Sequence, residues 1–200
     1  MTIKYFSPSW YYHGKLPMLQ REKIIKAFSD FINDDNNFQN KNQWSCNVLT
    51  SYDTDGKDMR WKTFQDCVSP CIKEFMDSMR PRCDLDIRMK GAWINRYRKG
   101  DHKEMHEHTW PDVNIAMVYF YTTNYDNSFK FHNDTFSNYA SSGLFDCFDI
   151  PNMSKISPEV REGDVIMFPA HYYHMVAPNM ADLERVTISA NFHITRTRAP

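Results

Sequence analysis

The sequence predicts an α+β protein with a mostly β core, built as a curved double-sheet barrel supported by N-terminal helices. Two observations carry this prediction. Before Pro81, apolar residues recur at helical spacing in two segments. After Pro81 the pattern changes to the period of two typical of β-strands, in segments too close together for repeated βαβ units. We expect one domain over residues 1–200, with residues 1–90 as helical support and first strands and 91–200 as the barrel core.

The two helices are expected over residues 16–31 and 64–79. In the first, Leu19, Ile24 and Phe28 follow helical spacing, and the polar run 33–37 ends the segment. In the second, the apolar residues again lie on one face, and Pro70 falls within the first two turns, where proline is tolerated. Both segments therefore have an apolar face that can cover a sheet.

The strands are expected where β-forming residues cluster or alternate with polar ones. They cover residues 44–49, 85–89, 92–97, 115–121, 129–131, 165–168 and 185–194. Residues 1–17 are expected to be irregular or strand-like. The polar stretch 133–157 is expected to be a long loop or lid with one or two short strands, and a loop of this length is usually functional or mobile.

Composition narrows the range of partners and compartments. The formal net charge is −1 with no long charged block, which argues against nucleic acid or an anionic membrane as the main partner. No stretch approaches the roughly 20 apolar residues of a membrane-spanning helix, and the N-terminal segment lacks a signal-peptide core. Five irregularly spaced cysteines suggest reduced thiols. We expect a cytoplasmic protein, while the oligomeric state stays open.

A pair of histidines, His106 and His108, is the most informative feature of the chain. Successive side chains of a strand point to opposite faces, so these two imidazoles face the same side and Glu107 faces the other. His174 follows the segment 165–168 and is the best third ligand, with His171 as its competitor. Three protein ligands leave positions open for substrate or oxygen, as a catalytic metal requires.

A carboxylate could take the place of one histidine. The common iron oxygenase triad has two histidines and one Asp or Glu. Glu107 would need the strand to twist it inward, and Asp112 would need the loop after His108 to fold back. Either arrangement remains open at this point, although three histidines are the simpler prediction.

The last strand provides a cation near the predicted metal. Arg185 begins a strictly alternating segment in which Arg185 and Asn191 share a polar face. That face is either exposed to solvent or lines a polar barrel interior, where the guanidinium could bind a carboxylate with two hydrogen bonds. Tyr119 could donate a hydrogen bond to the same carboxylate or be an ordinary packed tyrosine. In the strand expected over residues 92–97, Asn95 shares one face with Trp93 and Tyr97.

These residues resemble a known family over about residues 93–191. The matching pieces are Trp93-x-Asn95, Gly100-Asp101 leading to His106-x-His108, Val118-Tyr119, Gly163-Asp164-x-Ile166-x-Phe168-Pro169 leading to His174-x-Val176-x-Pro178-Asn179, and Arg185-Val186-x-Ile188-Ser189-x-Asn191. In order and spacing they are similar to the 2-oxoglutarate/Fe(II) oxygenases common in marine bacteria and their phages. These are relatives of prolyl-4-hydroxylase-like enzymes with the double-stranded β-helix (jelly-roll or cupin-like) fold.

The resemblance implies roles for the residues that match. His106, His108 and His174 would hold Fe(II), and Arg185 would bind the distal carboxylate of 2-oxoglutarate. Tyr119, Asn95 and Asn191 are our further candidates for contacts to the cosubstrate. The implied reaction is oxidative decarboxylation of 2-oxoglutarate coupled to hydroxylation of a small-molecule or peptidyl substrate. A phage-encoded enzyme would act in the host cytoplasm.

The chain departs from the family pattern in two places, and two other functions remain open. The loop 109–114 lacks the expected Ser-Gly step, and the segment 129–134 lacks flanking Gly and Pro, so the substrate is not determined. One alternative is a cupin-like dioxygenase with three-histidine iron that does not use 2-oxoglutarate. The other is a non-catalytic β-barrel binding module. A three-histidine site also carries one less negative charge than the common triad and should bind Fe(II) less tightly.

Overall fold

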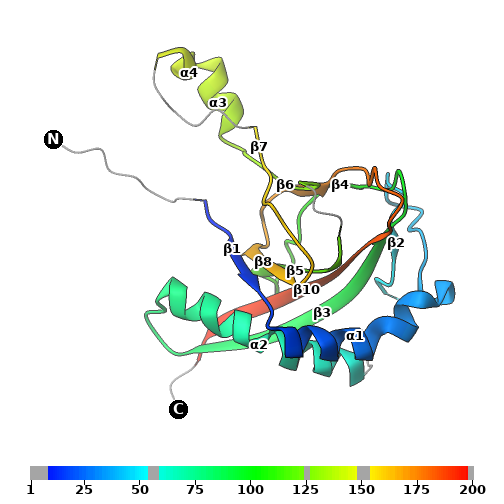
Figure 1. Cartoon of the computed structure of the whole chain (residues 1–200). Helices are drawn as coiled ribbons and strands as arrows, with labels where there is room; N and C mark the ends of the chain where they lie inside the picture. Colours follow the sequence, from blue (N-terminus) through cyan, green and yellow to red (C-terminus); the bar gives the residue numbers. More distant parts are fainter. Residues whose placement is uncertain (1–8, 54–58, 124–126, 148–153, 198–200) are drawn as a thin grey trace.

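Two antiparallel sheets face each other, and two helices cover the outer side of the larger one (Figure 1). The computed structural model describes residues 9–53, 59–123, 127–147 and 154–197. This arrangement confirms the expected α+β fold of double-stranded β-helix type, with its N-terminal helices outside the barrel. Residues 1–8, part of the expected irregular N-terminal segment, lie outside the described residues.

The larger sheet has six strands in the order β1-β8-β5-β10-β3-β2. Its strands are β1 (Tyr12–Lys15), β2 (Leu49–Thr50), β3 (Leu85–Tyr97), β5 (Ile115–Thr122), β8 (Asp164–Pro169) and β10 (Arg185–Arg196). The long strand β10 lies at the centre, between β3 and β5, and pairs with β3 along its whole length. Strand β10 is therefore the main support for side chains that point toward the smaller sheet.

The smaller sheet has four strands in the order β4-β9-β6-β7. Its strands are β4 (Lys103–His106), β6 (Phe129–His132), β7 (Lys155–Ile156) and β9 (His174–Val176). These strands are short, and the pairing of β4 with β9 is irregular between Lys103 and His106. Such an irregularity can turn adjacent side chains toward the same side of a sheet.

The helices differ from the expected boundaries for local reasons. Helix α1 (Met18–Asn33) begins two residues later than expected. Leu16 is buried, its backbone N–H donates to the carbonyl of Gly163, and it precedes Pro17, which disfavours helical backbone before it. Helix α2 (Met59–Met79) begins five residues earlier than expected, so Pro70 lies in its interior. A 3-10 turn, η1 (Asp35–Asn37), follows α1.

Three strand predictions need correction. Residues 44–46 form bends and 47–48 are irregular, so the strand expected over 44–49 is limited to β2. The two strands expected over 85–89 and 92–97 are one continuous strand, β3, with a register shift near Gly91 in place of a break. His108 does not lie on the same strand as His106, because β4 ends at His106.

The segment expected to be a loop contains two short helices as well as a strand. Helices α3 (Phe136–Ser141) and α4 (Leu144–Cys147) project away from the barrel, and β7 returns the chain to the smaller sheet (Figure 1). The rings of Phe136 and Phe145 lie 5.4 Å apart and pack on each other. Residues 148–153 of the expected loop lie outside the described residues.

Alternation along β10 separates two layers of the core. Its apolar side chains, including Ile188 and Phe192, point toward the helices and pack with Phe28 of α1 and Phe64 of α2. Its polar side chains point into the space between the sheets, which is closed by aromatic residues such as Phe129 of β6. The alternation therefore places a dry core under the large sheet and a polar cavity above it.

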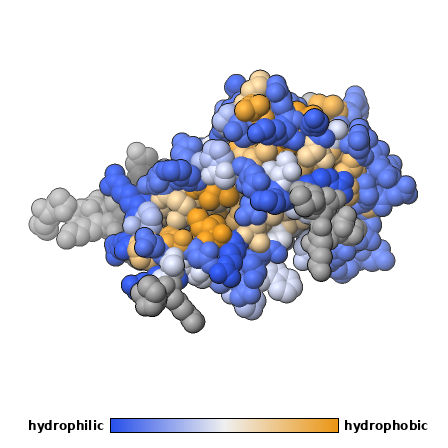
Figure 2. Space-filling view, turned by 90° about the horizontal axis from the view of Figure 1, so that it is seen from below, coloured by the Kyte–Doolittle hydropathy of each residue, from blue (hydrophilic) through white to orange (hydrophobic). Residues whose placement is uncertain are grey.

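The helix side of the molecule is mostly hydrophilic at its surface. Seen from below, this face carries a hydrophobic area surrounded by hydrophilic side chains (Figure 2). Exposed apolar residues of α1 include Met18 and Leu19, while Ile24 and Phe28 of the same helix are buried. No helix among the described residues is both long and apolar enough to span a membrane.

We expect the helix-side core to dominate stability. Phe64 is completely buried and its ring packs against Phe28, Trp61 and Tyr119. Phe64→Ala should lower the free energy of unfolding by about 3–5 kcal/mol, because it removes a large apolar side chain and leaves a cavity. Urea denaturation measures this loss, and Met18→Ala on the exposed side of α1 should change stability by only about 0.5 kcal/mol. Equal effects of both changes would contradict the described packing.

Candidate metal centre

Three histidines converge between the two sheets. His106 is the last residue of β4 and lies directly opposite His174, the first residue of β9. His108 follows two residues later, where its backbone N–H donates to the carbonyl of Ala170 at 2.8 Å. One nitrogen from each of the three rings lies within 4.8 Å of the others. The structure thus brings together the three histidines that the sequence singled out.

Each ring is oriented by a hydrogen bond at Nδ1. His106 Nδ1 lies 2.8 Å from the carbonyl oxygen of Glu104, and His174 Nδ1 lies 2.9 Å from that of Tyr172. His108 Nδ1 lies 2.8 Å from Oδ1 of Asn191. These oxygens can only accept, so each Nδ1 carries the hydrogen and each Nε2 keeps a lone pair. Such partners fix the tautomer and the orientation of histidine ligands in metal sites.

The surroundings keep all three imidazoles neutral. Burial, together with the neighbouring His108, lowers the pKa of His106 to about 3. Burial also lowers the pKa of His108, and it lowers that of His174 well below the usual value, with the two other rings adding to the effect. Neutral imidazole is the form that binds a metal ion, so the donors are ready near neutral pH.

The candidate carboxylates do not join this group. The Glu107 carboxylate accepts a hydrogen bond from the backbone N–H of Thr109, although its side chain lines the neighbouring cavity. Asp112 is exposed and pairs with Lys90 at 3.2 Å. His171 is exposed, and its ring packs edge-on against Tyr172. Among the described residues, the three histidines therefore form the group suited to a metal ion.

A cavity of about 430 Å³ extends from the histidines between the sheets. Arg185 lines it and is almost completely buried, with its guanidinium carbon 5.6 Å from the ring centre of Tyr97. Nη1 of Arg185 donates to the carbonyl of Ala177 at 3.4 Å. A buried guanidinium in the same cavity as the histidines is a suitable partner for a carboxylate of a bound ligand.

The two candidate asparagines also face this cavity, with different partners. Asn95 accepts a hydrogen bond from the Thr50 hydroxyl at 2.8 Å and donates to Ser189 at 3.3 Å. Asn191 accepts from His108, so its amide orients a metal-ligand candidate. Asn191 therefore bears on the metal centre at least as directly as on a cosubstrate.

Tyr119 lies on the other side of the large sheet. It pairs with Ile188 across β5 and β10, and its ring lies 6.2 Å from Phe64 of α2. Burial raises its pKa to about 12. Its neighbours Val118 and Phe120 face the cavity instead. The structure does not bring Tyr119 to Arg185. The prediction was wrong because the sequence does not give the register of β5 against its neighbours, and so does not show which face of β5 lines the cavity.

Tyr97 is the tyrosine that the sequence reasoning missed. It is the cross-strand partner of Arg185, lines the cavity and is buried, which raises the pKa of its phenol. The signal was present, because Tyr97 shares a face with Asn95 at the end of β3. Lys103 and Glu104 also line the cavity and pair with each other at 2.9 Å. The irregular pairing of β4 brings both of these adjacent residues to the cavity wall, which alternation does not predict.

The wall beyond the histidines is aromatic. It contains Trp44, Tyr52, Trp93 and Trp110. The ring centres of Tyr52 and Trp93 are 5.2 Å apart, and that of Trp93 is 5.5 Å from His108. Trp110 is largely exposed, so this wall leads from the metal-ligand candidates to the surface.

A family model described as "Putative 2OG-Fe(II) oxygenase" matches residues 91–191, just over half of the chain. The chain belongs to the 2OG-Fe(II) oxygenase family. Fe(II) and 2-oxoglutarate are thus the metal and cosubstrate of the enzyme, and the three neutral imidazoles and the buried guanidinium suit them chemically. Neither a cupin-like dioxygenase without 2-oxoglutarate nor a non-catalytic barrel has support in these findings. A search of curated proteins found no match.

Solved structures share the fold at low sequence identity. A prolyl hydroxylase from Trichoplax adhaerens, in complex with a hypoxia inducible factor peptide fragment, is 11% identical over 92% of this chain and 83% of that one, with a TM-score of 0.63. HygX from Streptomyces hygroscopicus, with nickel, 2-oxoglutarate and hygromycin B bound, is 12% identical over 92% and 83%, with a TM-score of 0.56.

A third relative is longer than this chain. It is a 2OG-Fe(II) oxygenase family protein from Burkholderia pseudomallei, 17% identical over 67% of this chain, with a TM-score of 0.50. The match spans 57% of the length of the Burkholderia protein. At these identities the three structures establish the fold, and the prolyl-4-hydroxylase-like relationship expected from the sequence agrees with them.

The buried imidazoles should make the metal-free protein sensitive to acid. The pKa of His106 is about 3 in the folded chain, against about 6.5 when unfolded. Between these values the unfolded chain binds a proton that the folded chain does not, so stability falls as the pH drops below about 6.5. We expect His106→Gln to lose less stability than wild type between pH 7.5 and 5, as measured by urea denaturation in chelator.

The control for this experiment is His171→Gln, which removes an exposed imidazole. Its pH dependence should match that of wild type. If the His106 variant also followed the wild-type curve, His106 would not be held neutral by burial, and the described environment would be wrong.

Proposed function

We propose that His106, His108 and His174 bind Fe(II) through Nε2, and that Arg185 binds the distal carboxylate of 2-oxoglutarate in the adjoining cavity. Residues 1–200 would act as a single domain, with the helices supporting the sheet that carries Arg185. The observation that carries this proposal is the arrangement of the three rings, whose Nδ1 atoms all face oxygen acceptors. Fe(II), when bound, supplies the oxygen chemistry that decarboxylates 2-oxoglutarate to succinate and oxidises a substrate.

The protein residues supply orientation, charge and shielding. Arg185 is buried, so its guanidinium, and not solvent, would offset the negative charge of a bound carboxylate. Tyr97 stays protonated because burial raises its pKa, so its hydroxyl can donate a hydrogen bond at the same end of the cavity. Phe120 and Phe129 are buried and form an apolar part of the cavity wall. Fixed groups hold a ligand with little reorganisation.

The substrate would enter along the aromatic wall formed by Trp44, Tyr52, Trp93 and Trp110. Aromatic side chains offer broad apolar contact surfaces together with polar edges. The Trichoplax structure contains a peptide and the Streptomyces structure contains hygromycin B, so a peptidyl or a small-molecule substrate are both compatible with this fold. We propose hydroxylation of one such substrate near His108.

The function is tested by iron-dependent turnover of 2-oxoglutarate. Purified protein with Fe(II), oxygen and 2-oxoglutarate should form succinate slowly even without substrate, and chelator should abolish this activity. Succinate can be measured by NMR. His174→Ala should lose the activity, while His171→Ala should keep it. Succinate formation that is independent of iron, or unchanged in His174→Ala, would contradict the proposal.

A second prediction concerns Arg185. Arg185→Gln should weaken 2-oxoglutarate binding by about 100-fold or more, since truncating one partner of a buried charge pair costs several kcal/mol. Mn(II) binding, measured by calorimetry without 2-oxoglutarate, should stay nearly unchanged. Tyr119→Phe serves as the control, because its ring lies on the helix side of the sheet. Equal weakening of metal and 2-oxoglutarate binding in Arg185→Gln would contradict the assignment.

A further inference from the structure

Two loops adjoin the strand ends that carry Arg185 and Tyr97. Residues 98–102 connect β3 to β4, and residues 177–184 connect β9 to β10. Tyr97 is the last residue of β3 and Arg185 is the first of β10, and the two are direct cross-strand partners. Both residues thus stand where the strand ladder ends. Their positions depend on how well the two loops are fixed.

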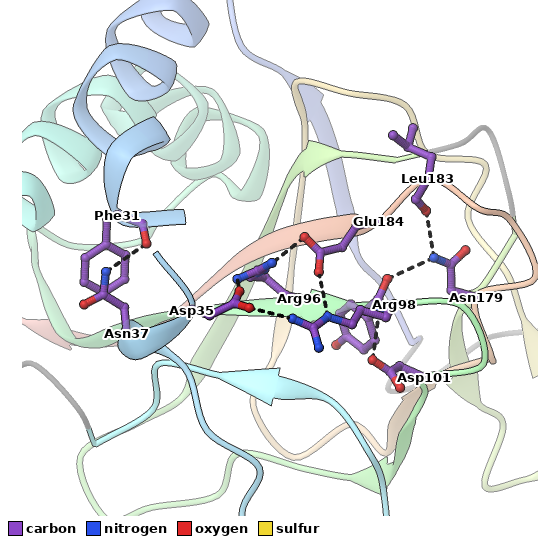
Figure 3. Close-up of polar contacts among 10 residues, drawn as sticks. Phe31, Asp35, Asn37, Arg96, Arg98, Asp101, Asn179, Leu183 and Glu184 are labelled. Carbon is purple, nitrogen blue, oxygen red and sulfur yellow. Dashed lines mark hydrogen bonds and ion pairs between the residues drawn. The ribbon is translucent and has the colours of Figure 1, made fainter. Parts of the chain in front are cut away.

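Asn179 joins the ends of these two strands through its side chain. It is completely buried, and its Nδ2 donates to the carbonyl of Tyr97 and to that of Leu183, both at 2.9 Å (Figure 3). Its Oδ1 accepts from the backbone N–H of Ala181 at 3.2 Å. Both amide hydrogens and the amide oxygen are therefore in use, and a side chain of another shape would not reproduce these bonds.

The backbone of Asn179 joins the same two loops. Its carbonyl accepts from Gly100 N–H at 2.8 Å, and its own N–H donates to the carbonyl of Asp101 at 2.9 Å. The Asp101 carboxylate in turn accepts from the backbone N–H of Arg98 at 2.8 Å. One buried residue thus fastens the β3–β4 loop to the β9–β10 loop.

An ion cluster holds Glu184, the residue directly before Arg185. Its carboxylate pairs with Arg96 Nε at 2.9 Å and with Arg98 Nε at 3.6 Å (Figure 3). Arg96 is largely buried and also pairs with Asp35 at 2.6 Å. Partly exposed ion pairs contribute less than a buried amide that makes three hydrogen bonds. The cluster is therefore a secondary restraint on the start of β10.

We propose that Asn179 is a positioning residue for 2-oxoglutarate, which it does not touch. It sets the distance between the guanidinium of Arg185 and the phenol of Tyr97, the two groups at the carboxylate-binding end of the cavity. This inference rests on the proposed function of Arg185. Glu184 acts in the same way with a smaller effect. The metal centre is held by other bonds, at Glu104, Tyr172 and Asn191, so its affinity does not depend on Asn179.

The proposal separates cosubstrate affinity from metal affinity and from stability. Displacing a binding group by about 1 Å can cost up to roughly 100-fold in function. Asn179→Ala should therefore raise the dissociation constant for 2-oxoglutarate by about 10-fold to 100-fold in the Mn(II)-loaded protein. Its affinity for Mn(II) alone should stay within about twofold of wild type. A residue that only stabilised the fold would leave both dissociation constants unchanged while the variant stays folded, and would weaken Mn(II) and 2-oxoglutarate binding alike if part of the variant unfolds.

A matched control is Asn114, which bonds to β10 near the end opposite Arg185. Asn114 donates its amide to the carbonyl of Ile194 at 2.7 Å and accepts from the N–H of Ile194 at 2.9 Å, far from Arg185 along β10. Asn114→Ala removes the same chemical group and should leave 2-oxoglutarate affinity unchanged. Glu184→Gln is a milder second variant at the cavity end, used if Asn179→Ala does not fold, and should weaken 2-oxoglutarate binding by about 3-fold to 10-fold.

The experiment is calorimetric titration of Mn(II), and then of 2-oxoglutarate, into the wild-type chain and the three variants. Weaker 2-oxoglutarate binding in Asn179→Ala or Glu184→Gln, with unchanged Mn(II) affinity and an unaffected Asn114→Ala, supports the proposal. Wild-type affinity in both cavity-end variants overturns it and leaves the proposed function intact. Failure of the Mn(II)-loaded wild type to bind 2-oxoglutarate overturns the proposed function and the positioning role together.

Discussion

Three imidazole rings, two of them buried and that of His106 partly buried, share one small space, and the site depends on three oxygen atoms that accept their Nδ1 hydrogens. Two of these oxygens are backbone carbonyls close in sequence to the histidines they orient, and the third is the amide of Asn191 on β10. Without these acceptors the tautomers would not be fixed, and the lone pairs would not meet at one point. Burial also keeps the rings neutral, which is the form that binds a metal ion.

The strand β10 connects this metal centre to the rest of the enzyme. On one face it carries Asn191 beside His108 and Arg185 at the opposite end of the cavity. On its other face, residues such as Ile188 pack against the helices. A change in the helix-side core would therefore reach both the metal and the cosubstrate through one strand.

Much of this could be predicted from the sequence, because strict alternation in one long strand fixes which residues share a face. That pattern placed Arg185 and Asn191 together and, with the spacing of the histidines, predicted the metal centre. Alternation alone does not give the register between strands, and a slip of one residue exchanges the two faces of a strand. Tyr119 was assigned to the cavity for this reason, while Tyr97 was overlooked. Cavity residues that depend on irregular backbone, such as Trp44 and Lys103, have no periodic signal.

The most direct test of the account is a crystal structure of the anaerobic protein with Fe(II) and 2-oxoglutarate, with anomalous data collected at the iron edge. The account predicts one iron peak at about 2.0–2.2 Å from Nε2 of His106, His108 and His174, the usual metal–imidazole distance. It also predicts a 2-oxoglutarate carboxylate on Arg185. Iron bound by two histidines and a carboxylate such as Glu107, or iron at another place, would contradict the three-histidine centre.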